Sequence, residues 1–429
     1  MFRNKILKNT LVLSSILCIP FSFLDKAQAQ NTVSTPYSQF GLGQVLNNSS
    51  VINLGMGGIK NGIRYDNAIN ISNPASLSAL RYTTFEVGAF ATLSKMSSLS
   101  GTAQGTNAAM SYLKVAFPFT DKWGTSFGLV PFSGVGYESR IQGRMADTPV
   151  TNVYSGSGGL NQFYIATSYE VYKGLSIGIN ANYIFGSIDR SKSAEFPDSL
   201  AFTSARVTNS TYIGSLLLNF GIQYHKTFSN GKYITLGLSD NLPTNLNATR
   251  NTLSKRYFVN GLGNEQTIDT ISISNDEKGK IEFPMLNSIG FSYGKINKFM
   301  IGADLSTGQW SNLVVYGQNQ NLQNTFDLSL GGFIIPKHDA VGNYLKTIEY
   351  RMGFNYGKSY VSINNQNINQ YSVNFGFGLP LPRSASRINL GFEYGIRGTQ
   401  EAGLIKEEFL GIHAGFNFCD KWFMRRKYD

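Results

Sequence analysis

With 45 glycines, 23 tyrosines and 30 phenylalanines among 429 residues, and only 15% of its side chains charged, the chain differs from a soluble domain of this length. Its formal net charge is +11, but no basic stripe with interleaved aromatic residues appears, which argues against a nucleic-acid partner. Beyond the first 29 residues no apolar run approaches the roughly 18 residues that a spanning helix needs, so any membrane-spanning segments are expected to be strands.

Residues 1–29 have the features of a secretory signal peptide. They contain, in order, a basic start, an apolar core and a small-x-small cleavage pattern: Arg3, Lys5 and Lys8, then 11–24, then Ala27-Gln28-Ala29. A spanning helix is the alternative, but the apolar core is short and is broken by Pro20. Removing four basic residues and one acidic residue with this segment lowers the net charge from +11 to +8. The mature chain keeps one cysteine, Cys419, which excludes an internal disulfide.

The next region, residues 30–81, shows little strand alternation and is rich in Gly, Asn and Ser. Gly55-Met56-Gly57-Gly58 suits tight turns, and residues 72–77 suit one short helix with Asn73 as its cap and Pro74 at its first position. We expect a compact, irregular lead-in. Its apolar residues would either form a binding surface or only pack against a wall: Phe40, Leu42, Val45, Leu46, Ile52, Leu54, Met56 and Ile59.

From Tyr82 onward, strand-like segments follow one another with no helical pattern between them. We predict 14 strands, at about 82–93, 108–118, 122–132, 160–171, 174–186, 212–227, 232–240, 285–294, 298–307, 324–335, 345–356, 371–380, 387–396 and 408–418. Short connections alternate with longer polar ones, the longest of which runs from about Asn241 to Pro284. An up-and-down barrel over residues 82–418, with short turns at one end and long loops at the other, predicts this alternation and an even strand count.

The alternation of side chains is clearest between Tyr371 and Tyr394. Large apolar residues such as Phe375 and Phe392 alternate there with glycine, serine and asparagine, on both sides of a turn at residues 380–383. A period of two places the large side chains on one face of each strand. A membrane barrel would turn this face toward lipid. We therefore predict an all-β fold, a 14-stranded antiparallel transmembrane β-barrel with an N-terminal plug in its lumen; a soluble all-β repeat or sandwich is the alternative.

Several short motifs point to a known family. They are Asn73-Pro74-Ala75-Ser76-Leu77, Trp123-Gly124 leading into Val130-Pro131-Phe132, Gly395-Ile396-Arg397-Gly398-Thr399 and Asp420-Lys421-Trp422-Phe423. Together with the signal peptide and the glycine-rich lead-in, they resemble the FadL-type outer-membrane transporters of hydrophobic compounds, and the last two are similar to FadL-like proteins of Gram-negative bacteria with type IX secretion. The resemblance implies that residues 30–81 form a hatch carrying the motif Asn73, Pro74 and Ala75, although Ser76 stands where the family often has glycine. It also implies a kink in the third strand that opens the wall sideways.

Pro131 lies near the end of the third predicted strand, where proline removes a hydrogen bond of the strand ladder. One interpretation is a lateral opening at Pro131, Phe132 and Gly134, through which an apolar solute passes from the lumen to the lipid. The other is an ordinary strand end, with Ser133-Gly134 starting a loop.

Four polar residues near the C-terminus are expected to point into the lumen by alternation: Glu349, Arg351, Glu393 and His413. Opposite charges there could pair with each other and anchor the backbone of a plug. Alternatively they could hold the carboxylate of a ligand, with Arg351 as the natural donor.

The sequence offers little for catalysis. Its three histidines, His225, His338 and His413, have neither metal-ligand spacing nor a nearby cysteine pair. A Ser-His-acid arrangement of the phospholipase kind would need an outward-facing His413, whereas alternation turns it inward. The chain has no nucleophile elbow or phosphate-binding loop. We therefore predict no enzyme, no cofactor and no metal site.

The favoured function is passive outer-membrane uptake of small hydrophobic molecules such as fatty acids, past the hatch and through the wall. The alternative is a barrel that does not transport but acts as a shuttle or scaffold subunit of a secretion machine, since the long polar connections could dock a protein. Expected partners are outer-membrane lipid and lipopolysaccharide, an apolar ligand and, in the alternative, a secretion-machine protein. Both termini, including the basic tail at residues 419–429, are expected on the periplasmic side.

Overall fold

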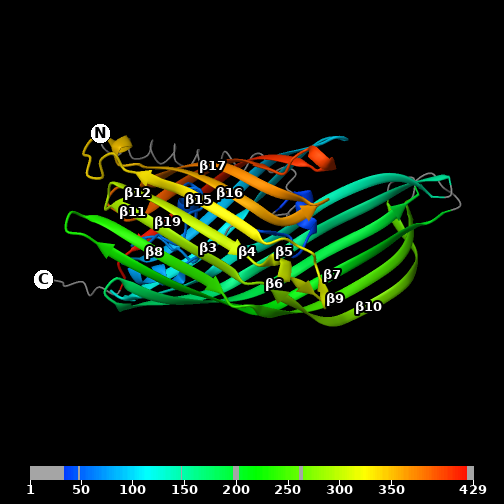
Figure 1. The fold of residues 1–429 in the computed structure, drawn as a ribbon, viewed down its shortest axis with the longest axis horizontal. Coiled ribbons are helices and arrows are strands. Elements are labelled where there is room, and N and C mark those ends of the chain that lie inside the picture. The colour runs from blue at the N-terminus through cyan, green and yellow to red at the C-terminus, as the bar shows by residue number, and fades with distance from the viewer. Residues whose placement is uncertain (1–32, 47–48, 146, 197–201, 260–263, 423–429) are drawn as a thin grey trace, which may run out of the picture.

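The computed structural model describes residues 33–46, 49–145, 147–196, 202–259 and 264–422, so the predicted signal peptide lies outside the described residues. They form an antiparallel sheet that closes on itself, because β19 pairs with β2 (Figure 1). The strands are β1 (Gln44–Val45), β2 (Thr83–Ser98), β3 (Gly101–Thr120), β4 (Trp123–Met145), β5 (Thr148–Tyr172), β6 (Leu175–Glu195), β7 (Ser204–Thr227), β8 (Lys232–Asn241), β9 (Thr244–Val259), β10 (Glu265–Phe283), β11 (Leu286–Lys295), β12 (Phe299–Gly308), β13 (Val314–Val315), β14 (Gln318–Asn319), β15 (Thr325–Ile334), β16 (Glu349–Ile363), β17 (Gln366–Pro380), β18 (Arg387–Arg397) and β19 (Lys406–Asp420). The described helices are short: α2 (Val51–Leu54) and the 3-10 helices η2 (Pro36–Gln39), η3 (Pro74–Ala79), η4 (Trp310–Asn312), η5 (Tyr344–Lys346) and η6 (Glu401–Gly403).

Two of the wall strands are each interrupted at a proline. Along β7, residues 219–227 pair with β8 and residues 204–213 pair with β9, so β8 and β9 form one interrupted strand. β10 and β11 pair with β9 and β8 in the same way. The interruptions contain Pro243 and Pro284, which cannot donate to a strand ladder. Counted in this way, the closed antiparallel barrel has 14 strands, and the predicted fold class is confirmed.

The prediction of a long loop from Asn241 to Pro284 was wrong. Most of this segment is the β9–β10 hairpin, which continues the wall, and β5 and β7 likewise begin about ten residues earlier than expected. We call the described residues of 137–157, 188–213 and 244–283 the extension, because their strands project beyond the rest of the barrel at one end (Figure 1). Their many polar side chains on both faces made them look like loops, since the alternation expected for a lipid-facing strand is lost there.

The outward face of the barrel is apolar, as the alternation predicted. On the last hairpins, Phe375, Phe392 and Ile412 are exposed, whereas Asn374, Asn389 and Asn417 are buried on the opposite face. An outer apolar band of this kind suits a barrel that spans a membrane. Among the described residues, no helix is both long and apolar enough to cross a membrane.

The described residues of 33–81, which we call the hatch, fill the barrel interior. Most of them are buried, and their apolar side chains share clusters with inward residues of the wall, for example Ile59 with Met300 and Leu77 with Tyr164. A further apolar cluster joins Leu42 of the hatch to Trp310, Tyr360 and residues of the extension. Apolar clusters therefore connect the hatch both to the barrel wall and to the extension.

Candidate functional site

Inward glycines of the wall form a seat for the hatch. A β-carbon built on any of twelve of them would lie within 3.4 Å of a hatch atom: Gly105, Gly124, Gly178, Gly221, Gly237, Gly290, Gly302, Gly331, Gly353, Gly376, Gly391 and Gly415. At Gly353, for example, the nearest atom is the backbone nitrogen of Gly57 at 2.1 Å. Strand alternation turns these glycines inward, and the structure places hatch atoms directly against them.

The predicted hatch motif lies within this seat. Asn73 caps η3 as expected, since its Oδ1 accepts a hydrogen bond from Ala75 N at 3.1 Å, and Pro74 is the first helical residue. Its Nδ2 lies within 3.3 Å of three carbonyl oxygens, those of Asn61, Ile222 and Leu238. Asn73 therefore ties η3 both to the rest of the hatch and to two neighbouring wall strands, β7 and β8.

Asp304 of β12 is an anchor that the sequence analysis missed. Its Oδ2 accepts hydrogen bonds from the backbone N–H groups of Lys60 at 2.6 Å and Asn61 at 2.7 Å. Nearby, Nε2 of Gln223 donates to the carbonyl oxygens of Asn61 and Ile63. Strand alternation marks Asp304 as inward, but only the folded hatch shows which backbone groups it meets.

Glu86 of β2 is a second anchor that the sequence analysis missed. Its Oε1 accepts hydrogen bonds from Ile69 N at 2.7 Å and from Asn417 Nδ2 at 2.6 Å. Its Oε2 lies 4.0 Å from Nζ of Lys114, and both charged side chains are fully buried. A buried ion pair of this kind costs solvation free energy, so we assign Glu86 the role of positioning the hatch at Ile69 rather than of stabilising the barrel.

The four lumen residues predicted as one cluster form two pairs. Nε of Arg351 lies 2.7 Å from Glu349, which is also bound by Arg387 at 2.6 Å. Nε2 of His413 lies 3.8 Å from Glu393. Between the pairs, α2 rests on wall glycines, with Gly55 against Gly376 and Val51 against Gly391.

Two ionisable hatch residues are shifted by burial. Burial lowers the pKa of Arg64 to about 10, so its guanidinium remains charged at neutral pH, and it donates to Ser78 Oγ at 2.8 Å. Burial raises the pKa of Tyr65 well above its ordinary value, and its hydroxyl donates to Asn53 Oδ1 at 2.8 Å. At neutral pH Arg64 is therefore charged and Tyr65 is neutral, and each donates a hydrogen bond to another residue of the hatch.

The wall contains a gap in its hydrogen bonding between β3 and β4. These strands pair only from Leu113 and Leu129 toward their shared turn, and β4 has a bulge between Pro131 and Ser133. Beyond that point β4 pairs with β5 on one side, while its other edge is met by the hatch: β1 pairs with residues 133–134, and Thr35 N donates to Gly136 O at 3.0 Å. Backbone groups left open in a membrane are costly, so the hatch acts here as a substitute wall strand.

The three residues predicted for a lateral opening lie at this gap. Pro131 is half-buried, Phe132 is buried and its ring centroid lies 5.8 Å from that of Phe283, and Gly134 faces Gly43 of the hatch. A β-carbon on Gly43 would lie 2.5 Å from Gly134 O, so hatch and wall touch through their backbones.

A cavity of about 590 Å³ lies beside the gap, and we call it the chamber. Pro131 and Phe132 line it, together with hatch residues such as Leu54 and Lys60. The rest of its lining is largely polar and includes Glu393 and His413. Trp310 and Tyr360, whose rings stack with centroids 4.7 Å apart, line it where it meets the apolar cluster.

The described residues contain no group of three or more His, Cys, Asp or Glu side chains that could hold a metal ion. His413 lies on the inner face, 9% exposed, beside Glu393 and stacked on Phe90. This is the inward position that alternation predicted.

Comparison with known proteins relates the sequence to one family model and the fold to solved structures. The family model BamG matches residues 7–429. The chain is similar in structure to the Pseudomonas putida toluene transporter TodX, with a TM-score of 0.57 and 16% identity over 88% of this chain and 98% of that one. It is also similar to the monoaromatic hydrocarbon channel CymD, with a TM-score of 0.54 and 13% identity over 90% of this chain and 100% of that one. No curated protein sequence matches it. The FadL-type resemblance is thereby confirmed at the level of the fold.

Proposed function

Since this chain belongs to the BamG family and has the fold of barrel channels for hydrocarbons, we propose that it is an outer-membrane channel for the passive passage of small hydrophobic molecules. The short turns and both termini would lie on the periplasmic side. Monoaromatic hydrocarbons, named for the structural neighbours, and fatty acids are the candidate solutes. No cofactor or energy source is involved in this proposal.

The observation that carries the proposal is the gap between β3 and β4 beside the chamber. A solute in the chamber touches Pro131 and Phe132, and beside them the hatch, not β3, pairs with β4. Movement of residues 34–46 away from β4 would open a lateral path. Several hydrogen bonds hold this segment to the wall and would have to break. They include Thr35 Oγ1 donating to Glu407 at 2.8 Å, Ser133 Oγ donating to Leu42 O at 2.8 Å and the Tyr360 hydroxyl donating to Gly43 O.

The test is a reversible cross-link across the gap. Val45 and Ser133 are register partners, so a Val45→Cys, Ser133→Cys pair in a Cys419→Ala background can form a disulfide that locks the segment. We expect oxidation to reduce the uptake of radiolabelled toluene by at least tenfold and reduction to restore it.

The matched control is a Ser97→Cys, Thr102→Cys pair, which joins register partners of β2 and β3 without crossing the gap. Its oxidation should leave toluene uptake unchanged. If the locked gap variant still takes up toluene at the wild-type rate, the lateral route is wrong.

One observation favours the alternative role as a scaffold subunit of a secretion machine. In the extension, β10 pairs with β9 along its length. Among the described residues, its other edge is met near Ile281 and Glu282 by β13 and by Tyr316, whose N donates to Lys280 O at 3.0 Å and whose hydroxyl donates to Glu277 O at 3.2 Å. Ile268, Ile271 and Ile273 are exposed on β10. An open strand edge is a template for pairing with another chain. Co-purification of a stoichiometric protein that is lost when residues 264–276 are replaced by a glycine-serine linker would support this role.

A further inference from the structure

The lining of the chamber is rich in asparagine, and we call these side chains the asparagine wall. Eight asparagines line it, on seven wall strands: Asn107 on β3, Asn180 and Asn182 on β6, Asn219 on β7, Asn241 on β8, Asn287 on β11, Asn355 on β16 and Asn374 on β17. A hydrocarbon gains nothing from carboxamides, which exchange hydrogen bonds with hydroxyl and amide groups. The composition of this wall therefore does not fit a purely apolar ligand.

Two acceptors on this wall have no partner. Asn182 is 2% exposed, and its Nδ2 donates to Asn219 Oδ1 at 2.9 Å and to Leu217 O at 3.3 Å. These two hydrogen bonds fix the orientation of the carboxamide, so its Oδ1 points away from Asn219 and Leu217. That Oδ1 and the Oδ1 of Asn180, which is 3% exposed, are buried without a hydrogen-bond donor. A buried acceptor without a partner is costly, so a molecule whose donors reach these two oxygens would gain hydrogen bonds there.

The charges of the chamber favour an uncharged molecule. Its described lining has three cationic side chains, Lys60, Lys358 and Arg397, and four acidic ones, Asp240, Asp327, Glu393 and Glu407. Arg397 lies 3.3 Å from Glu407, so this cation is already paired. With no excess of cations, an anionic head group would gain little on entering.

The asparagine wall begins close to the gap. Asn182 and Asn180 lie on β6, two strands from Pro131 on β4 and three and five residues along β6 from Phe185, which is level with Pro131. The usual strand spacing and rise put them roughly 14 and 19 Å from Pro131. We propose that the chamber binds an amphipathic molecule by an uncharged head group rich in hydroxyl donors, such as a sugar, while its apolar part lies at Pro131 and Phe132. This inference rests on the proposed function only for the route of the apolar part; the head-group site stands on the asparagine wall.

The test compares three probes on the full-length mature protein in lipid nanodiscs: octyl glucoside, octanoate and toluene, with empty nanodiscs as the blank. We expect octyl glucoside, below its micellar concentration, to bind more tightly than octanoate of the same chain length. Asn180→Leu removes a carboxamide whose oxygen is unpaired, so the barrel should fold normally. This variant should weaken octyl glucoside binding about fivefold, the value of one hydrogen bond, and leave toluene binding within twofold. Asn367→Leu, at an exposed position of β17 outside the chamber, is the matched control and should change neither affinity.

Each outcome decides something. Toluene binding without octyl glucoside binding would mean that the wall holds only water, and it would overturn this inference while leaving the proposed function intact. Tighter binding of octanoate, or unchanged octyl glucoside affinity in Asn180→Leu, would also overturn it. If octyl glucoside binds as expected but toluene does not, the head-group site stands and the hydrocarbon function falls.

Discussion

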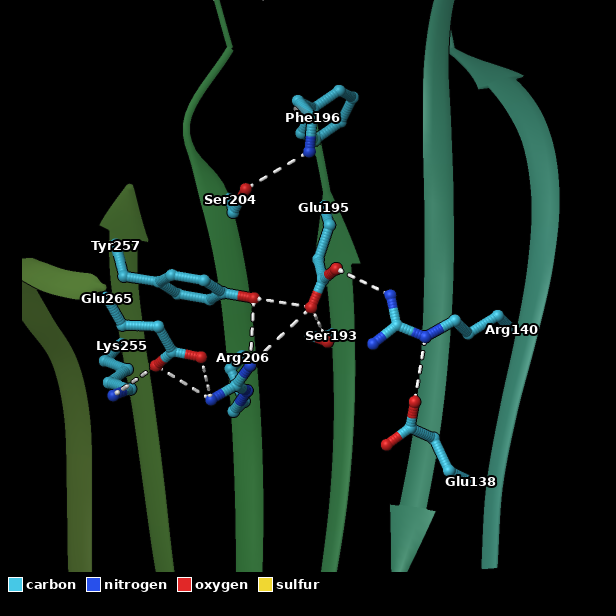
Figure 2. Close-up of polar contacts among 10 residues, drawn as sticks. All are labelled: Glu138, Arg140, Ser193, Glu195, Phe196, Ser204, Arg206, Lys255, Tyr257 and Glu265. Carbon is cyan, nitrogen blue, oxygen red and sulfur yellow. Dashed lines mark hydrogen bonds and ion pairs between the residues drawn. The ribbon is translucent and has the colours of Figure 1, made fainter. Parts of the chain in front are cut away.

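The hatch seat and the outer face of the extension use the same kinds of polar group in opposite surroundings. In the seat, buried carboxylates such as Asp304 accept hydrogen bonds from backbone N–H groups of the hatch. On the extension, carboxylates pair with arginine and lysine side chains at the surface (Figure 2). Because a buried group without a partner cannot turn to water, each contact in the seat should matter far more than an ion pair on the extension.

Figure 2 shows how the network on the extension crosses several strands. Arg206 lies between Glu195 at 3.6 Å and Glu265 at 2.6 Å, and its guanidinium stands 4.7 Å from the ring centroid of Tyr257. Arg140 of β4 joins the network through Glu195 at 3.8 Å. Glu195 is seven residues beyond the inward Ile188 on β6, so alternation places the network on the outer face. The network links strands outside the lumen and touches neither hatch nor chamber.

The largest effect is expected where backbone meets backbone. In Gly353→Val, the new side chain would collide with Gly57 N and the Met56 carbonyl carbon, both 2.1 Å from its β-carbon, and neither atom can move without lifting the hatch. We expect a loss of about 3 kcal/mol or more in the stability of the seated hatch. The measurement is limited trypsin digestion, which should become rapid at Lys60 and Arg64.

The matched control for this substitution is Gly357→Val, on the same strand. Its β-carbon would meet only side-chain atoms of Asp327 and Asn355, at 3.0 and 4.0 Å. Digestion of this variant should match wild type. Equal rates for Gly353→Val and wild type would mean that the hatch does not rest on the glycine seat.

The second effect comes from a single carboxylate. Asp304→Ala leaves the N–H groups of Lys60 and Asn61 buried without an acceptor, at a cost of about 2–4 kcal/mol. We expect the urea concentration needed to expose Lys60 to trypsin to fall clearly. The comparison variant is Asp269→Ala, which removes the same group from an exposed pair with Arg256 on the extension and should leave that concentration unchanged.

The third effect separates two roles of one side chain. Asn73→Ala removes both the cap on η3 and the contacts with the carbonyls of β7 and β8, for a loss of about 1–2 kcal/mol. Asn73→Ser keeps a side-chain acceptor for the cap of η3 and loses the amide donor that reaches the wall carbonyls. If the two variants unfold at the same urea concentration, the contact with the wall accounts for the whole effect and the cap contributes nothing.

The sequence predicted the barrel but not the partners within it. Period-two alternation revealed the strands, the face of each and, through Asn73 and Pro74, the start of η3, because these are local properties of the chain. It could not reveal that Asp304 or Glu86 contacts the hatch. The contact of Asp304 joins segments more than 200 residues apart, and Glu86 contacts a hatch segment that has no regular secondary structure. The extension was missed because its polar strands lack the apolar face on which the prediction relied.

The smallest effect tests the network on the extension. Arg206→Met removes ion pairs whose members are each 22–35% exposed, so the free energy of unfolding should fall by only about 0.5–1 kcal/mol, and 1 M salt should remove most of that difference. Salt should not rescue Asp304→Ala, because the lost contacts are buried hydrogen bonds from backbone N–H groups rather than an exposed ion pair. A salt-insensitive loss of several kcal/mol in Arg206→Met would contradict the comparison, since it would mean that the extension supports the barrel as the hatch does. An unchanged trypsin pattern in the hatch of this variant would instead assign the network to local stiffening of the projecting strands.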